Sequence, residues 1–225
     1  MRLTALLKSS GIPQGLADPE ITSLCYDSRK AEKGCLFFAL PGKNHDGAAF
    51  AAQAAEKGAA AIVAEKSLPQ SDCPLVIVSN ARQAMADIAS AFYSHPSLSL
   101  KAVGITGTNG KSTTAKLLYD ILKDQKKDVR LVGNIGNPIL LEKKIKKDTL
   151  FVIEASSYQL EYSKLFKTNI SLILNITPDH LERHKTINKY VSAKFKLIKN
   201  QSKNDIAILN TKNFYIKREL KKKKF

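Results

Sequence analysis

A glycine-rich turn, Gly107-Thr108-Asn109-Gly110, leads directly into Lys111 and Ser112 and separates an apolar run from a helical pattern. Glycines allow the backbone N–H groups to turn inward, and the following helix directs its positive dipole end at the same space. Lys111 adds a full charge, and Ser112 offers a hydroxyl to Mg²⁺. The strict phosphate-loop pattern would have a glycine at Ile105, so the match is to a shorter form, and a plain glycine turn is the alternative. The predicted nucleotide-binding residues are Gly107, Thr108, Asn109, Gly110, Lys111, Ser112 and Thr113.

Three further polar residues follow apolar runs typical of strands. Asn134 comes after 129–132, Glu154 closes 149–153, and His180 comes after 170–176. In open α/β sheets, ligands bind beyond the carboxyl ends of the strands, which is where these residues and the glycine turn are expected. A carboxylate at Glu154 could reach a metal held by nucleotide phosphates, or it could be a solvent-exposed charge at a strand end. His180 alone is a weak signal, because a single histidine after a strand is usually structural.

Strands alternate with helices in both parts of the chain, so the predicted fold class is α/β. A small N-terminal α/β domain is expected at 1–97, with strands at 21–26, 35–40, 60–64 and 75–78 and a helix at 81–93. A central domain is expected at 98–213, with strands at 101–106, 129–132, 149–153, 170–176 and 205–210. Its helices are expected from the glycine turn to about 125 and at 186–201. Residues 214–225 indicate a basic tail.

The net charge of +16 arises entirely after residue 100. The first hundred residues hold 9 basic and 9 acidic residues, whereas the remainder holds 27 and 11, and lysine rises from 6 to 24. This shift suggests that the two parts come from differently biased genomes; a single gene with a lysine-rich domain is the alternative. No apolar run is long enough for a membrane span, and three cysteines without metal-ligand spacing indicate reduced thiols, so we expect a cytoplasmic protein.

Taken together, these residues resemble the Mur ligases, which add amino acids to UDP-N-acetylmuramoyl precursors of the cell wall. The resemblance rests on residues 106–113, 133–136, 154–161 and 175–183, which stand in the family's order. The central region most resembles the D-glutamate-adding enzyme. The resemblance implies that this region is a partial P-loop NTPase-like domain. Asp27-Ser28-Arg29, 34–42 and Asp46-Gly47 instead resemble the UDP-binding domain of the diaminopimelate- or lysine-adding enzyme. The two parts therefore point to different siblings.

The resemblance implies that ATP phosphorylates a carboxylate of a UDP-N-acetylmuramoyl substrate and that an incoming amino acid, most simply D-glutamate, displaces the phosphate. Addition of diaminopimelate or lysine is the alternative. ATP and Mg²⁺ are the implied cofactors. The implied catalytic residues are Lys111, Glu154, His180 and Lys194; the implied metal ligands are Ser112, Glu154, His180 and Lys194 in a carbamylated form; the implied substrate contacts are Ser28, Arg29, His45, Asp46 and Asn134. A solvated lysine at Lys194 and a helix-capping turn at Asp46 are the structural alternatives.

Two departures from the family are expected: a third domain is missing, and the central domain itself stops early. The family has a third domain, which nothing after Asn210 resembles, so we expect a truncated, frameshifted or chimeric chain that does not turn over alone. The basic second part also allows a non-catalytic nucleotide- or polyanion-binding fragment, although low aromatic content argues against a specific nucleic-acid site. A folylpolyglutamate synthetase-like ligase is a third possibility, disfavoured by the UDP-type first part. No membrane partner is expected.

Overall fold

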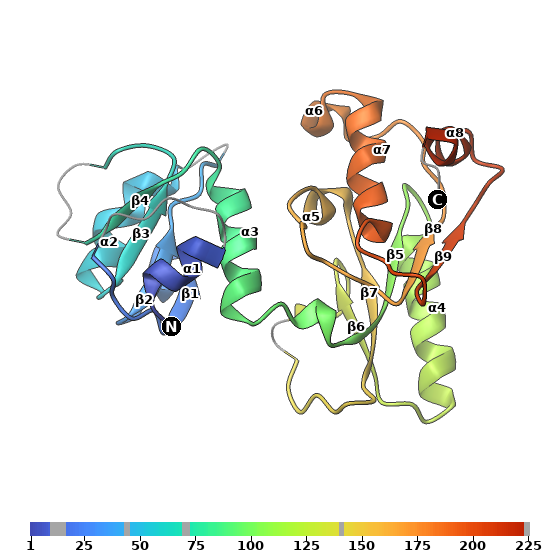
Figure 1. Ribbon diagram of the computed structural model, residues 1–225, viewed down its shortest axis with the longest axis horizontal. Helices are drawn as coiled ribbons and strands as arrows, with labels where there is room; N and C mark the ends of the chain where they lie inside the picture. Colours follow the sequence, from blue (N-terminus) through green and yellow to red (C-terminus); the bar gives the residue numbers. More distant parts are fainter. Residues whose placement is uncertain (10–16, 43–45, 69–72, 140–141, 223–225) are drawn as a thin grey trace. The chain divides into compact units, whose positions relative to one another are not determined.

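The computed structural model describes residues 1–9, 17–42, 46–68, 73–139 and 142–222 and divides into two compact units, Met1–Ser94 and His95–Phe225 (Figure 1). The division falls three residues before the expected domain boundary at residue 97. Each unit is an α/β structure built on a parallel sheet, as predicted. Every helix in the described ranges is too short or too polar to span a bilayer.

The first unit contains a sheet whose parallel strands follow chain order, β1 (Ser23–Cys25), β2 (Cys35–Phe38), β3 (Ala61–Ala64) and β4 (Leu75–Ile77). Successive side chains of β2 enter opposite cores because strand side chains alternate between faces. Leu36 and Phe38 pack with α1 (Leu3–Ser9) and α3 (Ala81–Phe92), whereas Cys35 and Phe37 pack with α2 (Ala51–Glu56). Two short 3₁₀ turns complete the unit, η1 (Ser28–Lys30) and η2 (Gly47–Phe50).

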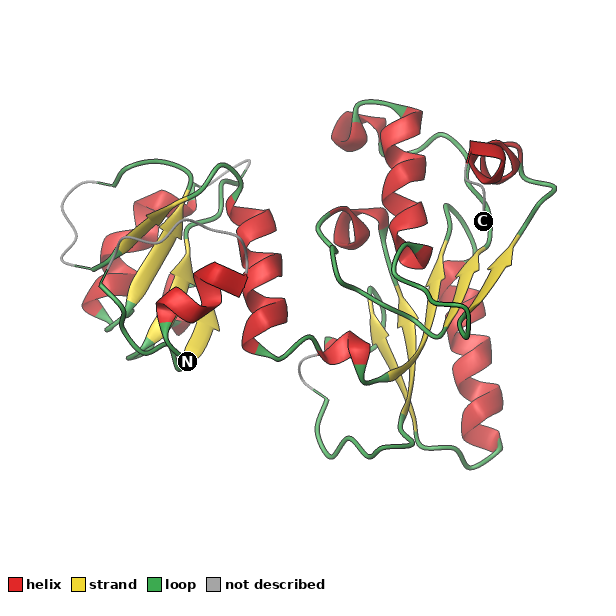
Figure 2. Ribbon diagram, viewed as in Figure 1, coloured by secondary structure: helices red, strands yellow, loops and turns green. Residues whose placement is uncertain are grey.

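The second unit has a five-stranded parallel sheet in the order β6-β7-β5-β8-β9. Its strands are β5 (Lys101–Thr106), β6 (Val129–Gly133), β7 (Leu150–Glu154), β8 (Ile170–Ile173) and β9 (Ile206–Leu209). Helices lie on both faces of this sheet (Figure 2). On one face, Ala115 of α4 (Lys111–Asp124) packs with Ile105 and Val152; on the other, α5 (Ser157–Glu161) and α7 (Ile187–Phe195) cover Ile173.

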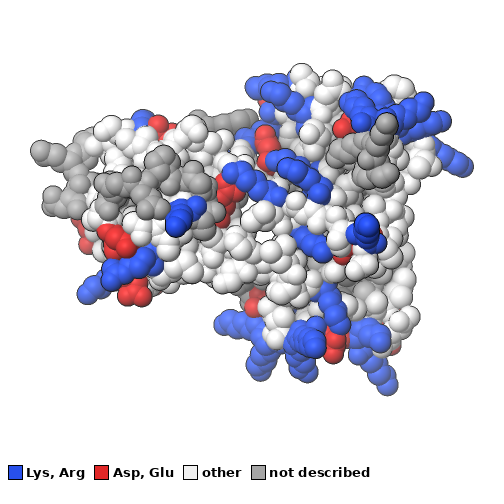
Figure 3. All heavy atoms as spheres, viewed as in Figure 1, with Lys and Arg blue, Asp and Glu red and all other residues white. Residues whose placement is uncertain are grey.

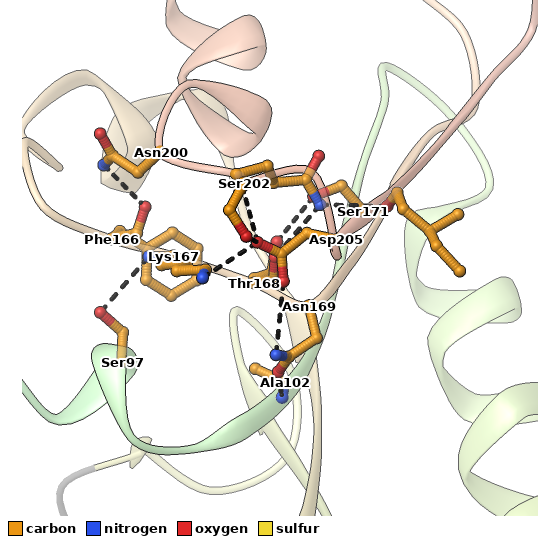
Figure 4. A network of polar contacts seen from close by, with 12 residues as sticks. Ser97, Ala102, Phe166, Lys167, Thr168, Asn169, Ser171, Asn200, Ser202 and Asp205 are labelled. Carbon is orange, nitrogen blue, oxygen red and sulfur yellow. Dashed lines mark hydrogen bonds and ion pairs between the residues drawn. The ribbon is translucent and has the colours of Figure 1, made fainter.

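Polar contacts join the beginnings of three neighbouring strands (Figure 4). Asn169 accepts a hydrogen bond from the Ala102 backbone N–H at 2.8 Å and donates to Asp205 at 3.5 Å. Asp205 also pairs with Lys167 at 3.0 Å and accepts from Ser202. The hydrogen bonds from Ser202, followed by Lys167, lower the pKa of Asp205 to about 2. This network stabilises the amino-terminal ends of β5, β8 and β9, opposite the end of the sheet that carries the glycine turn.

Two predicted elements differ in the structure. The helix expected at 186–201 is α7, which ends at Phe195 and continues as the 3₁₀ turn η5 (Lys196–Ile198). The prediction of a basic tail at 214–225 was wrong for the described residues of this segment, because they form the helix α8 (Phe214–Lys222). Ile216 of α8 is fully buried, and Leu220, one turn later, packs on the same core. The two apolar residues at helical spacing outweigh the lysines around them. All three cysteines lie in the described ranges and none forms a disulfide.

Candidate functional site

The glycine turn connects β5 to α4 and lies at the carboxyl end of the central strand (Figure 1). Gly110 has φ +81°, a left-handed conformation that favours glycine, and immediately precedes the first residue of α4. The Lys111 ammonium group folds back and donates to the Thr108 carbonyl at 3.0 Å. Ser112 and Thr113 lie in the first turn of α4, with both side chains exposed. The residues predicted to bind nucleotide thus form one continuous loop and helix N-terminus.

A segment after β8 holds this loop in shape. Asn175 accepts from the Asn109 N–H at 2.9 Å and donates to the Asn109 carbonyl at 3.0 Å. Thr108 donates its N–H to the Asn175 carbonyl at 2.9 Å, and its hydroxyl accepts from the Thr177 N–H at 3.0 Å. Asn175 was not predicted as a site residue; it belongs to the run 175–183 on which the family resemblance rests. Its two-way bond to Asn109 stabilises the loop without a ligand.

A buried carboxylate connects α4 to the end of β6. Glu154 is 1% exposed, so the alternative of a solvent-exposed strand-end charge is wrong. One of its oxygens accepts from the Ser112 hydroxyl at 2.8 Å and the other from the Asn134 side-chain amide at 3.0 Å. Gly133, with φ +107°, permits this approach because a Cβ there would lie 2.3 Å from the Glu154 carbonyl oxygen. Ser112, Asn134 and Glu154 are therefore brought together as expected.

Lys194 is buried on α7, at 1% exposure, so the alternative of a solvated helix lysine is also wrong. Its amine donates to the Gly107 carbonyl at 2.7 Å and lies 4.6 Å from the centre of the Tyr190 ring. Burial, followed by the charge of Lys111, lowers the pKa of Lys194 to about 7, while Asp179 acts in the opposite direction. The amine is thus held against the phosphate loop in a state that readily loses its proton.

An aromatic group that the sequence did not single out surrounds His180. The Tyr190 hydroxyl lies 3.2 Å from that of Thr108, and the Tyr190 ring is 6.1 Å from that of His180. His184 is 3% exposed, is stacked on Tyr158, and has Nε2 3.0 Å from the Ser157 hydroxyl. Burial lowers the pKa of His184. Tyr190 lies one helical turn before Lys194 in α7, and this spacing was the sequence feature that could have placed Tyr190 near the site.

The oxygen atoms at Ser112 and Glu154 suit Mg²⁺, which prefers hard oxygen ligands. His180 has φ +53°, and its ion-pair partners within the described ranges are Asp179 and Glu182 rather than Glu154. Within the described ranges, no group of three or more His, Cys, Asp or Glu side chains is arranged to hold a metal ion by itself. A magnesium ion held by Ser112 and Glu154 would take its remaining oxygen ligands from water or from a nucleotide.

The residues expected to contact the UDP moiety lie in the first unit. The Ser28 hydroxyl is buried and donates to Gln53 at 2.6 Å, and Arg29 is paired with Asp27 at 2.8 Å. Asp46 accepts from the Ala48 N–H at 3.0 Å and caps η2, which agrees with its capping alternative. His45 lies outside the described residues.

Family models match both units. Residues 20–93 match the model described as "Mur ligase family, catalytic domain", and residues 105–225 match "Mur ligase middle domain". A UDP-N-acetylmuramoyl-L-alanyl-D-glutamate–2,6-diaminopimelate ligase of Bacillus velezensis is 37% identical over 220 residues, which are 86% of this chain and 44% of the relative. The ligase of the same name from Cytophaga hutchinsonii is 33% identical over 225 residues, covering 88% and 46%. The chain spans about half the length of the curated relatives it matches.

Solved structures show the same fold. A UDP-N-acetylmuramoyl-L-alanyl-D-glutamate–2,6-diaminopimelate ligase superposes with a TM-score of 0.73 at 24% identity, over 98% of this chain and 50% of that one. A MurF ligase from Thermotoga maritima in complex with ADP gives a TM-score of 0.64 at 26% identity, over 89% and 48%. Single relatives match both units, so the two parts of the chain do not require two different parents.

Proposed function

Because the chain belongs to the Mur ligase family, we propose that its two units bind a UDP-N-acetylmuramoyl substrate and ATP for amide-bond formation by an ATP-dependent ligase. We infer that the amino acid added is of the diaminopimelate or lysine class rather than D-glutamate. The supporting finding is that relatives matched across both units carry the diaminopimelate-adding name. The resemblance to the D-glutamate-adding enzyme was drawn from the central region alone, whereas these relatives match both units.

In the proposed reaction, the γ-phosphoryl group of ATP passes to a substrate carboxylate and gives an acyl phosphate and ADP. The amino nitrogen then attacks the acyl carbon, loses a proton and displaces phosphate. Lys111 and the loop N–H groups hold the negative phosphoryl oxygens, because a helix N-terminus and a cation favour anions at the same point. Asn175 keeps the loop N–H groups in place before ATP arrives, which limits the reorganisation needed on binding.

Ser112 and Glu154 would hold Mg²⁺ beside the phosphates, and the ion would neutralise negative charge gathered between ATP and carboxylate. Asn134 keeps Glu154 oriented by donating to its second oxygen at 3.0 Å. His180 lies near this site through its ring contacts with Tyr158 and Tyr190. Its proposed role as a ligand rests on the family resemblance.

The observation that carries the proposal is the buried Lys194 amine, 2.7 Å from the Gly107 carbonyl of the phosphate loop. A neutral amine can attack carbon dioxide, forming a C–N bond and releasing a proton to solvent. The resulting carbamate is an anion with oxygen donors, and such donors would suit a site where Mg²⁺ binds together with phosphates. Burial and the nearby Lys111 charge favour the neutral amine that this step requires.

The carbamate can be tested by ¹³C NMR of the purified chain in labelled bicarbonate. We expect a carbamate resonance in the parent that is lost in Lys194→Gln. Lys189→Gln is the matched control, since Lys189 lies on the same helix but is exposed. A spectrum identical in Lys194→Gln and parent would remove Lys194 from the proposed site.

The substrate can be tested without turnover. Calorimetry would compare UDP-N-acetylmuramoyl-L-alanine with the same compound extended by D-glutamate. A ligase of the diaminopimelate or lysine class should bind the extended compound more tightly, since that compound is its acceptor. Tighter binding of the shorter compound would restore the D-glutamate assignment, and binding of neither would contradict a UDP-substrate role for the first unit.

A further inference from the structure

Lysine side chains gather at the amino-terminal edge of the second sheet. Lys101 begins β5 and is paired in register with Leu150, the first residue of β7, which is paired in turn with Val129, the first residue of β6. The segments that precede these three strands therefore lie side by side. Thr149 donates to Asp128 at 2.6 Å and so joins the segment before β7 to the one before β6. Figure 3 shows basic side chains along the lower edge of this unit.

This surface, here called the lysine edge, is strongly and openly charged. It holds eight lysines and Arg130 against four acidic residues, Asp124, Asp128, Glu142 and Asp148. Asp128 is paired with Arg130, and Asp148 with Lys101 at 2.6 Å. Six exposed lysines in the loops of this edge form no ion pair within the described ranges. They are Lys126, Lys127, Lys143, Lys144, Lys146 and Lys147. The eight lysines are Lys101, Lys123, Lys126, Lys127, Lys143, Lys144, Lys146 and Lys147.

An apolar side chain stands in the middle of this charge. Ile145 is 47% exposed and has two lysines on either side in the loop between β6 and β7. An exposed isoleucine makes no favourable contact with water, whereas the boundary between lipid headgroups and acyl chains accepts an apolar side chain surrounded by cations. By contrast, nonspecific nucleic-acid surfaces use aromatic rings for stacking, and the described residues of the lysine edge present no exposed aromatic side chain.

We propose that the lysine edge binds the surface of an anionic phospholipid bilayer, with the lysines against the headgroups and Ile145 inserted between them. This inference departs from the expectation of no membrane partner, which considered only spanning segments. It does not depend on the proposed ligase function. The edge is also separate from the phosphate loop, because the two lie at opposite ends of the six-residue strand β5, roughly 17 Å apart.

The test is flotation of the purified chain with vesicles of phosphatidylcholine alone or of equal parts phosphatidylcholine and phosphatidylglycerol. The test variant replaces Lys143, Lys144, Lys146 and Lys147 with glutamine. Each lysine near an anionic leaflet contributes a factor of about five, so the variant should bind the mixed vesicles at least ~100-fold more weakly. Ile145→Ser should weaken binding by about tenfold with the charge unchanged.

The matched control replaces four exposed lysines at or near α8 with glutamine. These residues follow the carboxyl end of β9, at the edge of the sheet opposite the lysine edge. They are Lys212, Lys217, Lys221 and Lys222. Retained binding in this control, with binding lost in the test variant, is the expected result. Equal loss in both variants would overturn the proposal in favour of a general effect of net charge. Tighter binding of random RNA than of mixed vesicles at the same salt, unaffected by Ile145→Ser, would overturn it in favour of nucleic acid.

Discussion

Gly133→Ala should strongly destabilise the strand pairing beneath the candidate site. Gly133 has φ +107°, and a Cβ there would lie 2.3 Å from the carbonyl oxygen of Glu154, on the neighbouring strand. The Cβ is fixed to the backbone of β6 and the carbonyl oxygen belongs to the backbone of β7, so neither atom can move without disturbing the paired strands. The Asn134 N–H, which donates to that same carbonyl at 2.9 Å, would be displaced as well.

The loss of folding stability can be estimated from the backbone conformation and from the Asn134 hydrogen bond. A non-glycine residue held at this φ costs about 1–3 kcal/mol. The weakened Asn134 hydrogen bond adds about 0.5–1.5 kcal/mol. Gly110→Ala is the matched control, because Gly110 also has positive φ, at +81°, but its Cβ would meet nothing closer than 3.8 Å. That control should cost only the left-handed conformation, about 1–2 kcal/mol.

Hydrogen exchange followed by mass spectrometry suits this comparison, because peptide-level exchange reports on β7 by itself. We expect β7 amides to exchange faster in Gly133→Ala than in Gly110→Ala. Equal protection of β7 in the two variants would refute the reasoning, because it would mean that the close approach to Glu154 carries no energetic weight.

Three further predictions concern single side chains. Lys111→Ala should weaken ATP binding in calorimetry by at least ~100-fold with little change in thermal stability, since the hydrogen bond of this ammonium group within the described ranges goes to the Thr108 carbonyl of its own loop; equal affinity would contradict the phosphate-loop assignment. Glu154→Gln should shift the magnesium dependence of ATP binding to higher concentration by about tenfold, and an unchanged titration would remove Glu154 from the metal site. Asp205, with its pKa lowered from 3.8 to about 2, stabilises the fold above pH 3.8 and loses this contribution as the pH falls toward 2. Circular dichroism should therefore show a shallower acid transition over this range in Asp205→Asn, and an unaltered transition would argue against the Ser202 and Lys167 contacts.

The sequence was most informative where local chemistry determines structure. Strand β5 begins and ends at the residues predicted, because an apolar run stops at a glycine-rich turn. Glu154 and Asn134 were both expected at the carboxyl ends of strands, and parallel pairing of β6 with β7 brings them together. Such ends are predictable because every strand of a parallel sheet points the same way.

Long-range contacts were not predictable in this way. Nothing local indicates that the Lys194 amine reaches Gly107, 87 residues away, or that Tyr190 meets Thr108. Helix α8 was missed for a different reason: its lysines dominate the composition, while its burial depends on Ile216 and Leu220 meeting the core of α7. In each case the deciding contact is made by tertiary packing, which outweighs local propensity.

The strand orders of the two sheets imply different histories during synthesis on the ribosome. The first sheet is ordered β1-β2-β3-β4, so each strand can join its predecessor as it emerges. In the second, β5 needs β7 on one side and β8 on the other. β5 ends at Thr106 and β8 at Ile173, so at about 5 to 20 residues per second roughly 3 to 13 seconds pass before both edges of β5 can be paired. Throughout that interval the nascent chain exposes an apolar strand, which makes it a candidate client for ribosome-associated chaperones.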